Sequence, residues 1–425
     1  MPLCAQYAGP AILSRGDAPS AMTSLEIKFQ PFVEVSGIYD TGLTGVGLTS
    51  QGDLANTTAE GVEIAFGVSG KHSWRHTVLG LNYRGDVRYY NQATDFNATD
   101  QSMLLGIKHQ FTRHVSLNLR ESAGIFSQSA GVLSLAQSVP FDPSQSVVPT
   151  TDFFDNRTIY ASTQADLVIQ KTARLSFDFG GSGFLNRRSS TALYGVTGGN
   201  AVADVQYRIS RHSTIGVNYN YTHYSFTGLF SSTDMHGGNA TYAMTLTRRL
   251  ELSSYGGFSR AETKFIQTVP VDPAITAIIG IVEGSRVVYS VRYIPTVGVR
   301  LSQTFSKGVL YLSGGHSVTP GNGLFLTSQA TNISGGYIYT GLRRWSFNLS
   351  AAYNDSESIG NVVGHYKDIN SSLTASRQLS RSIHAVLNIS ARKYESADFN
   401  LYNRVFYTAR VGVGFTPGDI PLRIW

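Results

Sequence analysis

Charged side chains with a shared orientation are the residues of this sequence that are most able to act on a solute. In the stretch 79–89, apolar residues take most odd positions, while Asn, Arg and Asp take even ones. Successive side chains of a strand point to opposite faces, so these charges would share one wet face. Such a face could select ions by its field, because Arg and Lys favour anions. Applied to every alternating stretch, the same rule places on the wet face Arg84, Asp86, Arg88, Lys108, Arg120, Asp178, Asp204, Arg208, Arg292, Arg300, Arg392 and Arg410. Mutual pairing of these charges, as in any polar interior, is the alternative role.

Catalytic signatures are absent from the sequence. It contains no Gly-x-Ser-x-Gly elbow, no His-Glu-x-x-His, no phosphate-binding Gly loop and no acidic calcium loop. The His residues are dispersed, and several fall at turns. Cys4 is the only cysteine, which excludes an intramolecular disulfide and a zinc site built on several Cys ligands. We therefore predict that the protein is not an enzyme and holds no cofactor or metal.

Two long polar stretches contain the same short pattern. The segment 137–143 reads Gln-Ser-Val-Pro-Phe-Asp-Pro and the segment 267–273 reads Gln-Thr-Val-Pro-Val-Asp-Pro. They fall in expected loops at 127–156 and 265–285, which are unusually apolar for loops that project into water. Folding inward over a central opening would hide the apolar residues, although a chance Pro-Asp turn or packing of the loops on each other would also explain them. The predicted constriction residues are Pro140, Phe141, Asp142, Pro143, Pro270, Val271, Asp272 and Pro273.

The alternation predicts the elements that would carry these residues. In the stretch 345–354, Trp345, Phe347 and Leu349 share one parity, and Ser346 and Asn348 share the other. Short turns with Lys, Arg or His recur about every 40 residues, and they alternate with longer polar loops. This pattern predicts an all-β, single, antiparallel, up-and-down barrel of about 18 strands, with 16 as the alternative. A soluble β-propeller or β-helix would not give strict alternation of short and long connections.

Composition supports a β-rich chain with an apolar exterior. Only 15% of residues are charged, well below the roughly 25% of soluble domains, and there are 43 Gly, 23 Tyr and 22 Phe. The longest charge-free apolar run, 274–282, is far shorter than the about 17 to 25 residues of a spanning helix. The net charge of +6 is spread along the chain. Such dispersed basic residues do not form a nucleic-acid patch.

These features together resemble a Gram-negative outer-membrane β-barrel of porin-like type. The resemblance rests on the even strand number, short turns at one rim, long loops at the other, outward apolar residues and the terminal Trp425. It covers residues 24–425. It implies an outer-membrane location, contact with lipid, insertion by the barrel-assembly machinery and short turns in the periplasm. The long third loop, 127–156, is similar to the loop that narrows general porins.

The chain ends are expected to lie outside the barrel. The start of the sequence has no basic segment and no apolar stretch, but Leu-Cys-Ala-Gln at 3–6 resembles the tail of a cleaved signal peptide. We therefore expect 1–23 to be a signal remnant with a periplasmic lead-in, and the true start to lie upstream. The barrel is expected over 24–416. Residues 417–425 would form a tail, because Pro417 and Pro421 interrupt a final strand.

The function expected from this architecture is transport. The barrel would pass small polar or anionic solutes through an Arg-lined interior that the two loops narrow. An exopolysaccharide-export barrel, similar to the alginate exporter, is the main alternative, although inward aromatics such as Tyr90, Tyr160 and Phe406 are only scattered. A plugged structural or adhesive surface barrel is the third. The pattern leaves the solute and any oligomeric state open.

Overall fold

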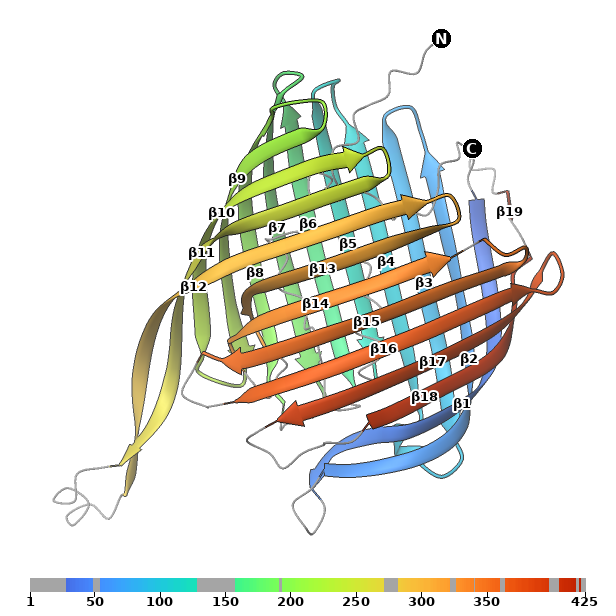
Figure 1. Ribbon diagram of the computed structural model, residues 1–425. Coiled ribbons are helices and arrows are strands. Elements are labelled where there is room, and N and C mark those ends of the chain that lie inside the picture. Colours follow the sequence, from blue (N-terminus) through green and yellow to red (C-terminus); the bar gives the residue numbers. More distant parts are fainter. Residues whose placement is uncertain are drawn as a thin grey trace.

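Stretches of alternating apolar and polar residues form β-strands along most of the chain in a computed structural model (Figure 1). Within the described ranges, no helix is long and apolar enough to cross a membrane. The segment expected to be a signal remnant lies outside the described residues. The structure describes residues 28–48, 54–127, 157–190, 193–270, 282–321, 326–339, 341–359, 364–396, 405–417 and 420–421.

The strands differ about twofold in length, apart from a final two-residue strand. The only other regular element in the described ranges is a short 3₁₀ turn, η2 (Thr94–Phe96). In chain order the strands are β1 Lys28–Leu48, β2 Leu54–Ser73, β3 Thr77–Tyr90, β4 Ala98–Gln110, β5 Val115–Phe126, β6 Thr158–Gln170, β7 Leu175–Arg188, β8 Gly195–Arg208, β9 Ser213–Thr227, β10 Ser232–Thr247, β11 Leu250–Pro270, β12 Glu283–Phe305, β13 Gly308–Thr319, β14 Ser328–Tyr339, β15 Trp345–Ser358, β16 His365–Gln378, β17 Ile383–Ser396, β18 Val405–Phe415 and β19 Ile420–Pro421.

Every strand from β1 to β18 pairs antiparallel with the next one, and β18 pairs back with β1. The closing pairs run from Val33 opposite Phe415 to Asp40 opposite Thr408. Closure joins the two strands that would otherwise be sheet edges. The predicted up-and-down barrel is confirmed, with 18 strands in the ring. The short β19 pairs with the first residues of β1, so part of the expected tail is attached to the sheet.

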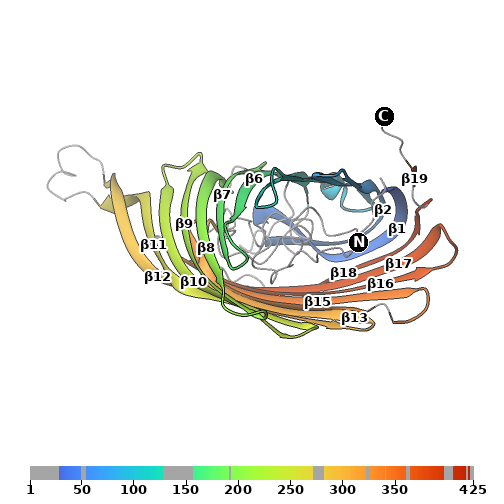
Figure 2. The same cartoon turned by 90° about the horizontal axis from the view of Figure 1, so that it is seen from above.

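The ring is an oval when it is seen from above (Figure 2). Strands β2–β6 form one long side, β13–β17 form the other, and β8–β12 curve round one end. Short turns join strands at one rim and longer connections join them at the other. Both β1 and β18 have their outer chain ends at the short-turn rim, as the sequence pattern predicts.

The outer surface is apolar because one parity of each strand faces outward. On β15, Leu349 is 54% exposed, whereas its neighbour Ser350 faces inward and is 5% exposed. The same alternation leaves Val35, Val217 and Val411 exposed on distant strands. An apolar band around a closed barrel is the surface that a lipid bilayer requires. The barrel is therefore a membrane-spanning one, and we call this band the lipid belt.

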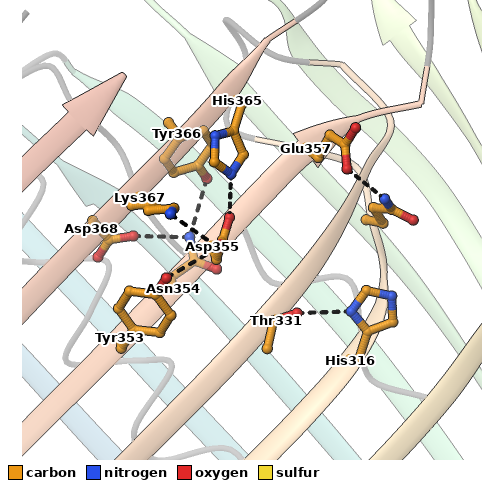
Figure 3. Close-up of polar contacts among 11 residues, drawn as sticks. His316, Thr331, Tyr353, Asn354, Asp355, Glu357, His365, Tyr366, Lys367 and Asp368 are labelled. Atoms are coloured by element: carbon orange, nitrogen blue, oxygen red, sulfur yellow. Dashed lines mark hydrogen bonds and ion pairs between the residues drawn. The ribbon is translucent and has the colours of Figure 1, made fainter. Parts of the chain in front are cut away.

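Polar side chains on strands β13–β16 contact one another near the long-loop rim (Figure 3). Outward Asp355 contacts His365, with 2.6 Å between Oδ1 and Nε2, and its other oxygen lies 3.9 Å from Lys367 Nζ. One row nearer the short turns, the outward residues include Ile333 and Ile369, which are 56% and 50% exposed. The side chains thus change from polar to apolar within one pair of residues. This boundary marks the long-loop edge of the lipid belt.

Two hairpins are longer than the sequence pattern predicts. The strands β1 and β2 pair as far as Leu48 opposite Leu54, although β18 pairs with β1 only as far as Asp40. The strands β11 and β12 pair from Leu250 opposite Gln303 to Pro270 opposite Glu283, which enters the expected loop at 265–285. In both hairpins the two strands continue to pair beyond the point where the adjacent strands stop. The polar and turn-forming residues in these stretches do not indicate such an extension.

Candidate functional site

The inner wall of the barrel carries the charges that the sequence pattern assigns to one face. Register and burial place all but one of them on this wall. Arg292 is the exception, because it is exposed on the part of the β11–β12 hairpin that extends beyond β13. The residues on the inner wall are Arg84, Asp86, Arg88, Lys108, Arg120, Asp178, Asp204, Arg208, Arg300, Arg392 and Arg410.

Arg88 on β3 lies at the centre of a buried ionic network. Its guanidinium forms an ion pair with Asp100 on β4, and its Nε lies 3.5 Å from Asp86 Oδ1. Its Nη2 also donates to Ser127 Oγ at 3.1 Å, and the Ser127 amide donates to Asp100 Oδ1 at 2.7 Å. The Arg88 side chain is only 3% exposed. Its charge is therefore balanced within the wall.

A second polar group joins the strands that close the barrel. Arg410 Nε on β18 lies 3.6 Å from Glu63 Oε2 on β2, across the intervening β1. The Thr408 hydroxyl donates to Asp40 at 3.0 Å, and Arg392 donates to the Gly42 carbonyl at 3.1 Å. These contacts connect the first two strands of the chain to the last two. They stabilise the seam where β1 meets β18.

The inner wall is less cationic than the sequence analysis predicted. The predicted inward acids are Asp86, Asp178 and Asp204, but the same alternation places further carboxylates on this face. The two-residue alternation that indicates their inward orientation is therefore visible in the sequence. The additional inward acids are Glu34, Asp40, Glu63, Asp100, Asp166, Glu251 and Asp368.

Two inward guanidinium groups differ from Arg88. Arg84 lies four residues before Arg88 on the same face of β3, and its Cζ lies 5.8 Å from the centre of the Phe32 ring. Arg300 on β12 faces Ser253 and Ser313 on the adjacent strands. Among the described residues, neither side chain forms an ion pair with a carboxylate. Glu34 acts electrostatically on Arg84, and Glu251 on Arg300, without forming an ion pair, so each positive charge is partly balanced and can still attract a solute inside the barrel.

The polar character of the wall changes around the ring. On β6–β8, Asp166, Asp178 and Asp204 are buried, and Asn218 donates to Asp204 at 2.5 Å. On β13–β17 the inward residues are mostly uncharged, and hydroxyl and amide groups bond across neighbouring strands. Examples are Ser313 with Ser334 at 2.7 Å, Ser350 with Ser372 at 2.8 Å and Asn388 with Thr374 at 2.8 Å. A solute inside the barrel would meet a charged side and a hydroxyl-rich side.

The predicted constriction by the loop 265–285 is wrong for its described residues. Phe265 to Pro270 and the residues from 283 onward form the two arms of the β11–β12 hairpin. This hairpin projects away from the barrel (Figures 1 and 2), with Pro270 at the end of its first arm. The physical reason is that backbone pairing continues along both arms. Val271, Asp272 and Pro273 lie outside the described residues, as do Pro140, Phe141, Asp142 and Pro143.

A different segment covers the inner wall at the long-loop rim. We call residues 326–328, which lead into β14, the strap. Leu326 packs against a buried cluster on β7–β9 that includes Tyr224 and Phe226. Thr327 Oγ1 lies 2.6 Å from Thr233 Oγ1 on β10, and the Ile359 amide donates to the Thr327 carbonyl at 2.8 Å. The partners on β7–β10 face inward, so the strap lies across the curved end of the oval. No motif in the sequence indicated this contact.

No group of three or more His, Cys, Asp and Glu side chains is arranged to hold a metal ion in the part of the chain that the structure describes. The polar contacts of the inner wall connect residues of the wall to one another. What they provide chemically is a lining that can exchange hydrogen bonds and charge with a solute.

Comparison with known proteins finds solved structures of similar architecture at low sequence identity. No family model and no curated protein matches the chain. Among solved structures, it is similar to Pseudomonas aeruginosa OccK2 in complex with glucuronate, with 12% identity over 92% of this chain and 98% of that one and a TM-score of 0.45. A BenF-like porin from Pseudomonas fluorescens shows 10% identity over 92% and 98%, with a TM-score of 0.45. Acinetobacter baumannii OccAB1 shows 11% identity over 94% and 99%, with a TM-score of 0.41. Such low values assign no function. The closed ring and its apolar exterior identify the chain as a transmembrane β-barrel, as the sequence pattern predicts.

Proposed function

We propose that this protein is an outer-membrane channel through which small polar and anionic solutes diffuse. The observation that carries the proposal is the combination of an 18-stranded ring with an apolar exterior and a polar inner wall. Barrels of about 16 to 18 strands are wide enough to leave an aqueous channel. A wall that is polar on every side is stable next to water and would be costly next to lipid.

The preference for anions rests on two guanidinium groups, because the inner wall as a whole carries about as many carboxylates as basic side chains. Inward charges that form ion pairs, such as Arg88 with Asp100, contribute little to the electric field inside the barrel. Arg84 and Arg300 project from the wall without an ion-paired carboxylate among the described residues. An anion passing either guanidinium would gain an attraction that a cation lacks. The proposal assigns no catalytic role to the protein.

Two further parts of the proposal rest on the sequence. Residues 138–143, within the loop 127–156, would narrow the channel, because their apolar side chains are better accommodated inside the barrel mouth than in water. The barrel-assembly machinery would insert the protein into the membrane, as the resemblance to outer-membrane barrels implies.

Single-channel recording of the purified, refolded protein in a planar bilayer tests the proposal. Wild-type protein should give discrete conductance steps, and deletion of residues 138–143 should raise the conductance at every salt concentration because it removes a steric obstacle. Heat-modifiable migration on a gel serves as the folding control for both proteins. Folded wild-type and deletion proteins that both fail to conduct would contradict the channel and favour a plugged structural barrel.

A further inference from the structure

The β11–β12 hairpin extends well beyond its neighbours on both sides. Strand β10 pairs with β11 only as far as Lys264, and β13 pairs with β12 only from Val297 onward. The remaining parts of β11 and β12 continue to pair with each other as far as Pro270 and Glu283. In Figures 1 and 2 this two-stranded arm projects outward past the wall of the oval. The arm therefore has faces that no other described strand covers.

Along β12 the outward face of this arm is apolar and aromatic, whereas Arg260, Glu262 and Lys264 take the outward positions of β11 beside it. On β12, Tyr293 and Tyr289 are each 72% exposed, and Val291 between them is 50% exposed. Val287 and Ile266 extend this surface toward the end of the hairpin. Because outward residues recur at every second position, the surface continues without a break from Val297 and Val299 in the lipid belt. We call the five residues from Tyr293 to Ile266 the arm face.

The strands on either side of β12 are polar at the same distance along the sheet. In the row that contains Val291, the outward residues on β9, β10 and β11 are His223, Asp234 and Glu262. His223 Nδ1 lies 2.8 Å from Asp234 Oδ1, and both side chains are exposed. On the other side, β13 becomes polar at His316, opposite Val297. The arm face thus lies beyond the long-loop edge of the lipid belt, where a bare apolar surface would be unfavourable.

The chemistry of the arm suits the head-group layer of a membrane. Tyrosine rings place an apolar body and a polar hydroxyl at the same interface, which is why they are enriched at both surfaces of membranes. Lys264 accompanies them, with its Nζ 4.4 Å from the Phe230 ring centre and 5.7 Å from that of Tyr289. A cation beside exposed tyrosines complements the anionic groups of a lipid surface.

We propose that the arm face lies on the outer leaflet of the membrane and anchors the β11–β12 hairpin among the lipid head groups. The lipid surface is the occupant favoured here, because the arm face is continuous with the lipid belt of the same barrel and carries tyrosines with a lysine. The inference is independent of conduction, since a plugged barrel would present the same face.

Spin labels on three single-cysteine variants test the proposal in the full-length protein. Cys4→Ser removes the native thiol, and Val291→Cys, Ser290→Cys and Val299→Cys place labels on the arm face, on the opposite face of the arm and in the lipid belt. The proteins are reconstituted into vesicles of equal parts phosphatidylcholine and phosphatidylglycerol. Collisions with oxygen and with a water-soluble nickel chelate then report the depth of each label. A gel-shift test on heating confirms that each variant is folded.

The expected result is a graded depth. The oxygen-to-nickel collision ratio at position 291 should be several-fold higher than at 290 and lower than at 299. Equal ratios at 291 and 290 would overturn the proposal, because both faces would then be in water. Dipolar broadening at 291 that disappears on dilution with unlabelled protein would also overturn it, since a second copy of the barrel would then cover the arm face.

Discussion

Arg84 and Arg88 show that two identical side chains on one strand can have different roles. Both face inward from β3, but Arg88 is almost completely buried between Asp86 and Asp100, whereas Arg84 is exposed and packs on Phe32. A buried charge is stable only when its partners compensate for lost hydration. Arg88 therefore serves the wall, and Arg84 remains accessible to a solute.

The difference predicts unequal effects of the same substitution. Arg88→Gln should lower the free energy of unfolding by about 3 to 5 kcal/mol, because it leaves the carboxylates of Asp86 and Asp100 without their buried partner. Arg84→Gln, on the same face of the same strand, should change it by less than about 1 kcal/mol, as is usual for exposed groups. Guanidinium unfolding in lipid vesicles measures both values. Similar losses in the two variants would refute the assignment of Arg88 to a buried network.

Arg300 and Arg292 form a second matched pair, eight residues apart on β12. Arg300→Gln should shift the reversal potential of the channel toward cations at low salt, because Arg300 lies on the inner wall. The shift should shrink at high salt, where the Debye length falls to about 3 Å at 1 M. Arg292→Gln should leave the reversal potential unchanged, because Arg292 is exposed on the projecting arm. A larger effect from Arg292 would place the selective region in the arm.

Among the elements, the strap is the one whose role depends most on a distant partner. Thr327 and Thr233 are 94 positions apart, yet their hydroxyl oxygens lie 2.6 Å apart in a buried contact. Leu326 adds apolar packing on β7–β9. The strap thereby holds the start of β14 against the inner wall at the curved end of the barrel.

Removing one hydroxyl should release this segment. Thr327→Val should cost about 1 kcal/mol, since the substitution keeps the shape but deletes a buried hydrogen bond. Hydrogen exchange followed by mass spectrometry should become faster in peptides that contain residues 326–328. The matched control is Ser313→Ala, which removes the Ser313–Ser334 contact elsewhere on the wall and should not accelerate exchange in the strap. Unchanged exchange in Thr327→Val would show that packing of Leu326 alone holds the strap.

At the scale of the whole molecule, the outer surface of the barrel faces the lipid bilayer and the inner surface faces water. Leu349 lies in the lipid belt with rows of apolar residues on both sides, and Asn348 faces inward from the adjacent position of β15. A barrel with this arrangement should respond to substitutions according to face and not to position along the chain.

Leu349→Arg should therefore destabilise the folded barrel by about 2 to 4 kcal/mol, the cost of a cation near the middle of a bilayer. Asn348→Ser should have little effect, because a polar side chain remains on the polar face. Reversible unfolding from lipid vesicles measures both changes. Equal damage from the two substitutions would mean that the register of β15 is wrong.

The sequence alone indicated the strand pattern, a ring of about 18 strands and the face of the sheet on which most side chains lie. These features follow from a period of two residues, which is local and visible in stretches such as 345–354. The inward orientation of Arg84, Arg88 and Arg300 follows from the same period. The additional inward acids, such as Glu63, could have been found by applying it to every strand.

Only the tertiary structure decided which of these residues meet and where each strand leaves the barrel. The Thr408–Asp40 contact joins residues 368 positions apart, and the strap contact at Thr327 crosses several strands. Arg292 has the alternation of an inward residue, but it does not line the inner wall, because β13 pairs with β12 only as far as Val297. Local alternation specifies the face of a strand. It contains no information about the length of the neighbouring strand, and that length decides whether a residue lies on the inner wall or on the projecting arm.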